Sequence, residues 1–403
     1  DKKRIEELKN CFDRTFEISE EDLKKINNVS FTNNSLLLIE ADLFIVTVPT
    51  PIDDSKRPLL KYLEEATTLI GKAIKERTNI VEKDSCPLIV YESTVYPKTT
   101  EEICVPILER ESGLIFNCLE PRKGFVCGYS PERINPGDKN HKLSSIIKVT
   151  SGSTIDSANW IDSFYGSIIK AGTYKAKNIQ VAEAAKVIEN TQRDLNIAFM
   201  NELVKVFNGL DINTNDVLDA AETKWNFLPF RPGFVGGHCI GVDPYYLIHK
   251  SQQAGVIPDL LLSARKINDE MSAYFAQKII RILNKHNIKL NDARILILGL
   301  SFKENCPDIR NSKIFDLISF LKNVNIDVDI YDPIIDSKEV KINFNLEVKS
   351  NPEKGIYDLS IITVPHKHFR NIGINKIRSW SKNNGLILDL KNTFPKKLVD
   401  YTV

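Results

Sequence analysis

The chain has 403 residues, of which 42% are hydrophobic and 27% charged, and its 54 Lys and Arg residues nearly balance 53 Asp and Glu residues. This length permits two or three packed domains, whereas the near-zero net charge argues against a nucleic-acid binder or a protein of anionic membranes, which need a basic surface. No apolar run reaches the roughly 18 residues of a membrane span, because Glu40 and Asp42 interrupt the richest run, 35–49.

Short apolar runs alternate with helical patterns in the first third of the chain. The β-rich runs 43–48 and 88–91 predict strands that are buried on both faces. Apolar residues at helical spacing predict a helix over 59–77, and the string TTEE at 99–102 resembles a capping box that begins another helix. This alternation of strand and helix predicts a parallel sheet covered by helices.

The middle of the chain has a helical character. From about 176 to 210 there is no Pro, and no Gly before Gly209, while apolar residues recur at helical intervals. This pattern predicts a long helix that joins two domains. Further helical patterns cover 214–222, 244–254 and about 258–286.

The alternation of strand and helix resumes after Asn291. We expect one helix over 312–322 and four strands, at 294–300, 327–331, 359–364 and 385–390.

A long-range repeat relates the two ends of the chain. The residues from Asp42 to Pro49 and those from Asp358 to Pro365 are identical at six of eight positions. The repeat predicts two related doubly wound domains. The first strand of the second domain begins 64 residues before Asp358, and the same spacing before Asp42 falls ahead of residue 1. No G-x-G-x-x-G occurs in the chain, so we expect the first domain to lack its opening strand and Gly-rich loop here.

A glycine-rich segment with a cysteine, 233–244, is the most unusual in the chain. Four glycines within nine residues allow its backbone to approach another surface closely. Cys239 precedes Asp243 and Pro244, and Pro244 suits the first turn of a helix. Peptide dipoles at such a junction can stabilise a thiolate, but a tight turn with an inert cysteine fits the local sequence equally well. We do not expect His238 to pair with Cys239, because adjacent side chains usually diverge.

Two polar clusters offer further chemistry. Lys186 and Asn190 lie at i and i+4, so on a helix they share a face and could present an ammonium and an amide to an oxyanion. The turn 129–138 offers Glu132 as an acid or base and Arg133 as an anion ligand. A solvated helical stripe and a plain surface turn are the simpler interpretations.

Polar residues also follow three predicted strands. Hydroxyls at 47–51 and 92–95 lie at the carboxyl ends of parallel strands, where open α/β sheets bind ligands. Turn formation is the alternative for these residues. In 300–312, which follows Gly299 and has no further glycine, Lys303 and Arg310 could bind phosphates and Phe302 could pack on a ring.

Together these segments resemble the UDP-glucose/GDP-mannose dehydrogenase family, from residue 1 to about 395. The strings 130–138 (SPERINPGD), 224–243 (KWNFLPFRPGFVGGHCIGVD) and 302–312 (FKENCPDIRNS) resemble the branch that oxidises UDP-N-acetylhexosamines at C6. The chain departs from the family at Lys98, where glycine is usual.

The resemblance implies an α/β fold with two doubly wound Rossmann-like domains, joined by a long central helix and a helical connector, the first domain being N-terminally truncated. We expect an NAD-binding domain over 1–174, a central helical, dimerisation and catalytic-cysteine region over 175–285, and a UDP-sugar-binding domain over 286–403. NAD is the implied cofactor, and the implied reaction is a four-electron oxidation of the C6 hydroxyl to a uronic acid for surface polysaccharide.

Family analogy implies roles for individual residues. Cys239 would form the thiohemiacetal and thioester, Lys186 and Asn190 would polarise the C6 oxygen, and Asp243 or Glu132 would assist hydrolysis. The remaining catalytic residue is Thr94. The implied cofactor-binding residues are Thr47, Pro49, Thr50, Thr94 and Arg310. The implied substrate-binding residues are Glu132, Arg133, Ile134, Lys186, Asn190, Phe230, Arg231, Gly233, Phe302 and Lys303.

Several alternatives remain. They are a UDP-glucose or UDP-N-acetylmannosamine 6-dehydrogenase, a truncated product that binds UDP-sugar without turnover, and a two-electron β-hydroxyacid dehydrogenase, which needs no cysteine. We expect a cytoplasmic homodimer or higher homo-oligomer with a UDP-N-acetylhexosamine substrate, no nucleic-acid or membrane partner and no metal. The seven cysteines lack zinc spacing and predict reduced thiols.

Overall fold

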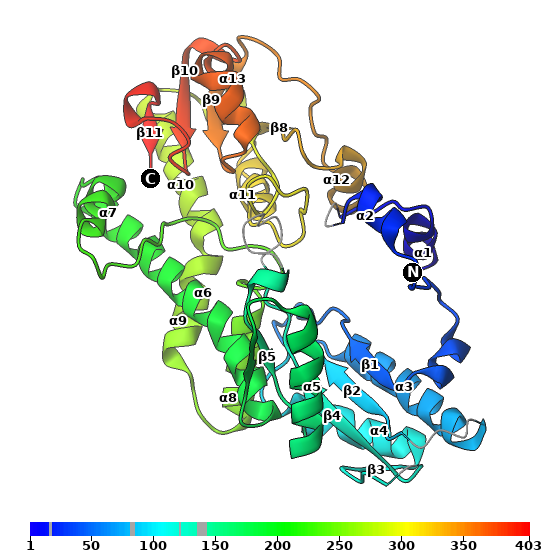
Figure 1. Cartoon of the computed structure of the whole chain (residues 1–403). Helices are drawn as coiled ribbons and strands as arrows, with labels where there is room; N and C mark the ends of the chain where they lie inside the picture. The colour runs from blue at the N-terminus through cyan, green and yellow to red at the C-terminus, as the bar shows by residue number, and fades with distance from the viewer. Residues whose placement is uncertain (16–17, 81–84, 121, 135–142) are drawn as a thin grey trace. The chain divides into compact units, whose positions relative to one another are not determined.

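The computed structural model describes residues 1–403 except 16–17, 81–84, 121 and 135–142. The chain divides into two compact units (Figure 1). Residues 1–51 and 58–186 form unit 1, and residues 52–57 and 187–403 form unit 2. The predicted domain boundaries near 174 and 285 stay predictions.

Unit 1 contains a parallel sheet of order β1-β2-β4-β3. The predicted strands are present as β1 (Leu43–Val46) and β2 (Leu88–Tyr91), and the predicted helix as α3 (Lys61–Ile80). The other elements are α1 (Lys2–Lys9), α2 (Glu20–Lys25), α4 (Val105–Ser112), β3 (Ile115–Phe116), β4 (Gly124–Tyr129), β5 (Lys148–Thr150), α5 (Ile155–Ile168) and β6 (Thr173–Lys175).

The strand β4 was not predicted because its two glycines weaken the β signal. The glycine at 128 has a packing reason, since a Cβ there would lie 2.2 Å from Cδ1 of Ile161 on α5. The helix therefore approaches the sheet closely where β4 has no side chain.

The predicted capping box at 99–102 is wrong. The segment Thr100–Cys104 is a π-helical turn leading into α4, and the Thr99 side chain does not cap it. The Thr99 hydroxyl donates instead to the Tyr96 carbonyl at 2.6 Å. The carboxylate of Glu183, which is distant in sequence, accepts the Thr100 N–H at 2.9 Å.

Unit 2 contains a parallel sheet of order β11-β10-β9-β7-β8. All four predicted strands of this region are present, as are the predicted helices over 214–222, 244–254 and 312–322. The strands are β7 (Arg294–Leu298), β8 (Asp327–Tyr331), β9 (Tyr357–Ile362), β10 (Ser381–Asp389) and β11 (Tyr401–Thr402). The helices are α6 (Ile179–Gly209, shared with unit 1), α7 (Thr214–Glu222), α8 (Asp243–Gln253), α9 (Asp259–Asp269), α10 (Met271–Lys285), α11 (Ile314–Lys322), α12 (Ser337–Phe344) and α13 (Lys367–Arg378).

The predicted helical pattern over about 258–286 is confirmed and comprises two helices, since α9 ends at Asp269 and α10 begins at Met271. The two helices pack differently. On α9 the buried side chains include Arg265 and Asn268, whereas α10 buries mainly apolar side chains in the core of the sheet. Hydrophobic periodicity predicts which face of a helix is apolar, but it does not predict where one helix ends and the next begins.

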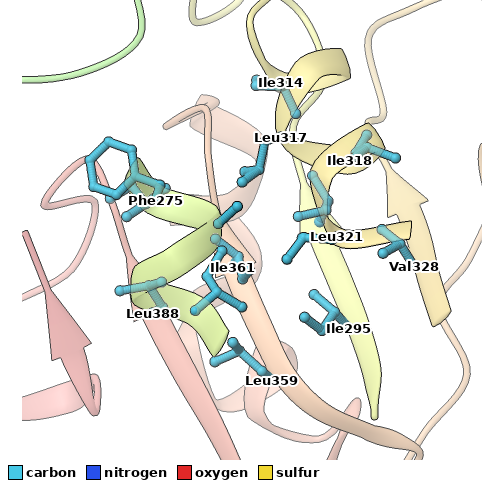
Figure 2. Close-up of a cluster of buried hydrophobic side chains, with 14 of the residues drawn as sticks. Phe275, Ile295, Ile314, Leu317, Ile318, Leu321, Val328, Leu359, Ile361 and Leu388 are labelled. Atoms are coloured by element: carbon cyan, nitrogen blue, oxygen red, sulfur yellow. The ribbon is translucent and has the colours of Figure 1, made fainter. Parts of the chain in front are cut away.

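Each buried strand of unit 2 contributes to two cores, as its continuous apolar character predicts. On β7, Ile295 and Ile297 pack with α10 and α11, whereas Leu296 and Leu298 pack with Phe369 and Ile377 of α13. Figure 2 shows the first core, where side chains of α10 and α11 meet those of the strands.

Each copy of the sequence repeat forms a strand of a parallel sheet, but among the described residues β1 is at the end of its sheet whereas β9 lies between β10 and β7. The strand β1 pairs in parallel with β2, as β9 pairs with β10. The expectation that an opening strand and a Gly-rich loop are missing stays a prediction. None of the helices among the described residues is long and apolar enough to cross a membrane.

Candidate active site

The carboxyl ends of β1, β2 and β4 are tied together in unit 1. The Thr50 hydroxyl donates to the Thr94 carbonyl at 2.7 Å, and Ser93 Oγ donates to the Val48 carbonyl at 2.7 Å. The Tyr129 hydroxyl donates to the Ser93 carbonyl at 3.1 Å. The turn with Thr47 and Pro49 thus lies beside Thr94 at the ligand-binding edge of the sheet.

The turn that holds Glu132 continues β4 along β2. The Ser130 N–H donates to the Tyr91 carbonyl at 2.9 Å. The Glu132 carboxylate accepts the Ile134 N–H, and Arg133 Nη1 donates to the Ile147 carbonyl at 2.8 Å. The rest of the predicted site turn, 135–138, lies outside the described residues.

A buried charge cluster that the sequence did not reveal supports this edge. Lys148 Nζ lies 2.8 Å from Glu92 Oε2, with the two side chains 4% and 13% exposed. The Tyr165 hydroxyl donates to the same carboxylate, and Lys148 Nζ lies 4.9 Å from the Tyr165 ring centroid. Burial and the Glu92 charge raise the pKa of Tyr165, so its hydroxyl remains a donor.

Glu183 and Lys186 lie one turn apart on α6, and both are buried. Burial raises the pKa of the Glu183 carboxyl to about 7 against the opposing hydrogen bonds. One of those bonds comes from the Lys98 N–H at 2.5 Å. Lys98 has a φ of +76°, so this chain keeps a left-handed turn with lysine where the family usually has glycine.

In unit 2 the cysteine loop, residues 233–243, leads directly into α8. The Cys239 carbonyl accepts the N–H groups of Val242 at 3.1 Å and of Asp243 at 2.8 Å. The Asp243 carboxylate is buried and accepts a hydrogen bond of 2.6 Å from Asn190 Nδ2. The predicted residues Cys239, Asp243 and Asn190 are therefore linked by hydrogen bonds in unit 2.

The His238 ring lies against Asp308 of the 302–312 segment, with Nε2 3.1 Å from Oδ2. Arg310 donates to the same carboxylate, with Nη2 2.6 Å from Oδ2. Burial alone would raise the pKa of Asp308, but hydrogen bonds from His238 and Arg310 outweigh it and hold that pKa well below its ordinary value. The carboxylate therefore joins the cysteine loop to the segment with the predicted NAD ligand.

The glycines of the loop permit a close approach, as predicted. A Cβ on Gly237 would lie 2.8 Å from two ring carbons of Phe302, and one on Gly236 would lie 2.6 Å from the Asn311 carbonyl oxygen. Asn311 Nδ2 donates to the Gly237 carbonyl at 3.2 Å. Two segments that the sequence singled out separately are thus packed together.

Lys391 is a candidate binding residue that the sequence analysis missed. It follows β10 at the carboxyl edge of its sheet, and its Nζ lies 2.0 Å from where a Cβ of Gly233 would be. Burial lowers the pKa of its ammonium. Lys391 and Arg231 both line a cavity of about 500 Å³. Arg231 Nη2 lies 2.7 Å from both Asp219 Oδ1 and Glu222 Oε1.

His366 hydrogen-bonds to the segment that contains Phe302 and Lys303. His366 Nδ1 accepts the Asn305 N–H at 2.9 Å, and its Nε2 lies 3.1 Å from the Asp332 carboxylate. Ser301 Oγ also lies 3.3 Å from Nε2, but all three side chains are buried. Because Nδ1 accepts a backbone bond and Nε2 faces a carboxylate, this Ser-His-Asp set positions a loop and offers no nucleophile. Phe230, another predicted residue, is half-buried ahead of the cysteine loop.

Three sequence profiles of one family cover most of the chain. The NAD binding domain of the UDP-glucose/GDP-mannose dehydrogenase family matches residues 1–169, the central domain matches 180–270, and the UDP binding domain matches 296–396.

Curated relatives match over nearly the whole chain. A UDP-N-acetyl-D-glucosamine 6-dehydrogenase of Pseudomonas aeruginosa is 50% identical over 388 residues, covering 96% of this chain and 89% of the relative. A protein of the same name from Salmonella typhi is 49% identical over 399 residues, covering 99% and 91%. The solved UDP-D-ManNAc dehydrogenase of Pyrococcus horikoshii is 27% identical, with a TM-score of 0.84, and the match covers 98% of this chain and 88% of that one.

Proposed function

Because this chain belongs to the UDP-glucose/GDP-mannose dehydrogenase family and is an NAD oxidoreductase with a UDP-sugar substrate, we propose that it oxidises a UDP-N-acetylhexosamine to the uronic acid through a thioester on Cys239. The family and the relatives support the NAD-dependent 6-dehydrogenase activity. The observation that carries the covalent step is the cysteine loop, in which Cys239 lies at the start of α8 beside the Asn190–Asp243 pair.

The residues of unit 1 fit part of an NAD site. The carboxyl edge of the sheet presents the turn with Thr47, Pro49 and Thr50 next to Thr94, and such an edge is where α/β sheets bind nucleotides. NAD bound at this edge would supply the hydride acceptor for both oxidation steps. Arg310 is the proposed pyrophosphate ligand, for which it would leave its hydrogen bonds to Asp308.

The chain's own residues supply the remaining chemistry. Lys186 and Asn190 polarise the C6 oxygen, so the C6 hydroxyl gives its proton to solvent water as the first hydride leaves for NAD. Cys239 Sγ then adds to the aldehyde carbon to give a thiohemiacetal, and loss of the second hydride gives a thioester. Water, deprotonated by Asp243 or Glu132, attacks the thioester carbon, and the thiolate leaves as the uronate forms.

We propose that unit 2 binds the nucleotide part of the substrate. Phe302 offers a ring face, Lys303 and Lys391 offer ammonium groups, and Arg231 lines the same cavity as Lys391. The half-buried Lys391 ammonium gains from an anionic ligand such as a diphosphate, because partial burial lowers its pKa and so disfavours its charge. Phe230 and Gly233, which flank Arg231 and Pro232 in the sequence, are further proposed substrate contacts, and Arg133 and Ile134 belong to the proposed sugar-contacting turn of unit 1.

The experiment compares Cys239→Ala with Cys11→Ala, a matched removal of another half-buried thiol. UDP-N-acetylglucosamine, UDP-N-acetylgalactosamine and UDP-glucose are each incubated with NAD, and both NADH and uronate are measured. We expect two NADH per uronate with an N-acetylhexosamine, unchanged output from Cys11→Ala and no uronate from Cys239→Ala. Undiminished uronate from Cys239→Ala overturns the thioester.

Calorimetry with UDP separates the alternatives. Binding of UDP without any NADH production favours a protein that binds UDP-sugar and does not turn it over. One NADH per substrate with indifference to Cys239 favours a two-electron dehydrogenase.

We further propose that two copies of the chain associate through α6. Ile188, Phe199 and Val206 are each about half exposed and are separated by 11 and 7 residues, so they form one apolar stripe along the helix. A second copy would bury this stripe. Light scattering tests the proposal: Phe199→Lys should lower the molecular mass from dimer to monomer, and an unchanged mass refutes it.

A further inference from the structure

The long helix α6 holds both ends of the cysteine loop. At the end of the loop, Asn190 Nδ2 donates to Asp243 at 2.6 Å. At its start, Asn201 Oδ1 accepts the Gly233 N–H at 2.8 Å and Asn201 Nδ2 donates to the Gly233 carbonyl at 3.0 Å. Asn190 and Asn201 are 11 residues apart, about three helical turns of 3.6 residues, and therefore share one face of the helix.

The orientation of the Asn201 amide follows from its neighbours. Asn268 Nδ2 donates to Asp194 Oδ1 at 2.7 Å, and a carboxylate can only accept, so Asn268 turns its oxygen to Asn201. Asn201 Nδ2 donates to that oxygen at 2.8 Å, which leaves Asn201 Oδ1 for the Gly233 N–H. Arg265 Nη1 fixes Asp194 in turn at 2.6 Å. Both Asn201 and Asn268 are buried.

We propose that Asn201 is a positioning residue for the reaction: its two bonds to Gly233 set the path of the cysteine loop and so the place of the Cys239 thiol. The loop has no helix or strand before α8 and carries four glycines, so the path of its backbone depends on contacts such as these two bonds and the bond from Asn311 Nδ2 to the Gly237 carbonyl. Gly233 has a φ of +154°, a conformation that its two amide bonds help to hold. This inference rests on the proposed role of Cys239. A displacement of about 1 Å at a reacting atom can lower a rate about 100-fold.

The test compares Asn201→Ala with Asn196→Ala, which removes a half-buried asparagine of α6 whose side chain donates to the Gln192 carbonyl of the same helix. Hydrogen exchange of the 233–243 segment and the rate of Cys239 alkylation by iodoacetamide report the loop without any turnover. Turnover gives kcat, and calorimetry gives the affinity for UDP.

For Asn201→Ala we expect faster exchange in the loop, an altered alkylation rate and a fall in kcat of about 10- to 100-fold. The affinity for UDP should fall as well, because Gly233, which Asn201 bonds, and the neighbouring Lys391 belong to the proposed UDP site. Asn196→Ala should behave as the parent protein does. Parent-like exchange, alkylation and kcat in Asn201→Ala overturn the inference.

Asn201→Asp adds a pH dependence of kcat that a purely packing role of Asn201 would not produce. When ionised, the new carboxylate repels the Gly233 carbonyl and Asn268 Oδ1; when protonated, it can again accept from and donate to Gly233. The charged groups around it are Asp194 and Arg265 through Asn268, and Lys391 beside Gly233.

The ratio of kcat for Asn201→Asp to that of the parent should therefore rise as the pH falls. A ratio that does not change with pH overturns the proposal that the two Asn201 bonds to Gly233 position the loop, even if Asn201→Ala does not fold. If Cys239→Ala still makes uronate, only the proposed thioester is refuted. Hydrogen exchange of the loop and alkylation of Cys239 in Asn201→Ala then still test the positioning role of Asn201.

Discussion

Gly237 is the position where a single methyl group tests the packing of the cysteine loop most directly. In Gly237→Ala the new Cβ would lie 2.8 Å from Cδ2 and Cε2 of Phe302. The residue also has a φ of +80°, a left-handed conformation that alanine adopts at a cost. The substitution therefore strains the backbone and displaces a ring that we propose contacts the nucleotide.

Both effects have expected magnitudes. The left-handed conformation costs alanine about 1–2 kcal/mol, and forcing a methyl into a filled space costs about 1–3 kcal/mol. The free energy of unfolding should fall by about 2–5 kcal/mol. The affinity for UDP should fall as well, since the Phe302 ring must move.

Gly241→Ala is the matched control in the same loop, because the nearest atom to its Cβ would be the Val235 carbonyl oxygen at 3.6 Å. Its free energy of unfolding should stay within about 1 kcal/mol of the parent. Denaturant unfolding and calorimetry with UDP are measured on both variants. If Gly237→Ala matches Gly241→Ala in stability and UDP affinity, the close approach of Phe302 to the loop is refuted.

Three further substitutions test buried charge and backbone strain. Burial raises the pKa of Glu183 from 4.5 to about 7, so its contribution to stability is full below pH 4.5 and falls by about 3 kcal/mol as the pH rises to 7. Glu183→Gln should therefore remove this pH dependence of the free energy of unfolding, measured by denaturant unfolding across the range. An unchanged pH dependence in the variant contradicts the raised pKa. Lys98→Gly should relieve the left-handed lysine and raise the free energy of unfolding by about 0.5–1 kcal/mol; a loss of stability would show that the turn is not strained. Lys391→Met should weaken UDP binding about 10- to 100-fold in calorimetry without loss of stability, since it removes a half-buried ammonium whose charge burial disfavours. Unchanged affinity excludes Lys391 from the site.

Local sequence predicted most elements because their signals are local. The strand β2 and the helix α7 begin and end where the apolar pattern does. The glycine-rich loop was also recognisable, since backbone freedom is a property of the residues themselves. The strand β4 escaped prediction because the reason for Gly128, the approach of Ile161, is a tertiary contact.

The sequence by itself determined the two strand-and-helix domains, the long helix and the residues able to carry chemistry. Tertiary structure alone decided which of them meet. Asn190 reaches Asp243 across 53 residues, and His238 reaches Asp308 across 70. Neither contact can be recognised from hydrophobic periodicity, because that pattern reflects neighbouring residues in the chain and not partners that are far apart in the sequence. Lys391 and Asn201 have ordinary local sequences, and their proposed roles follow from tertiary contacts with the same glycine, Gly233.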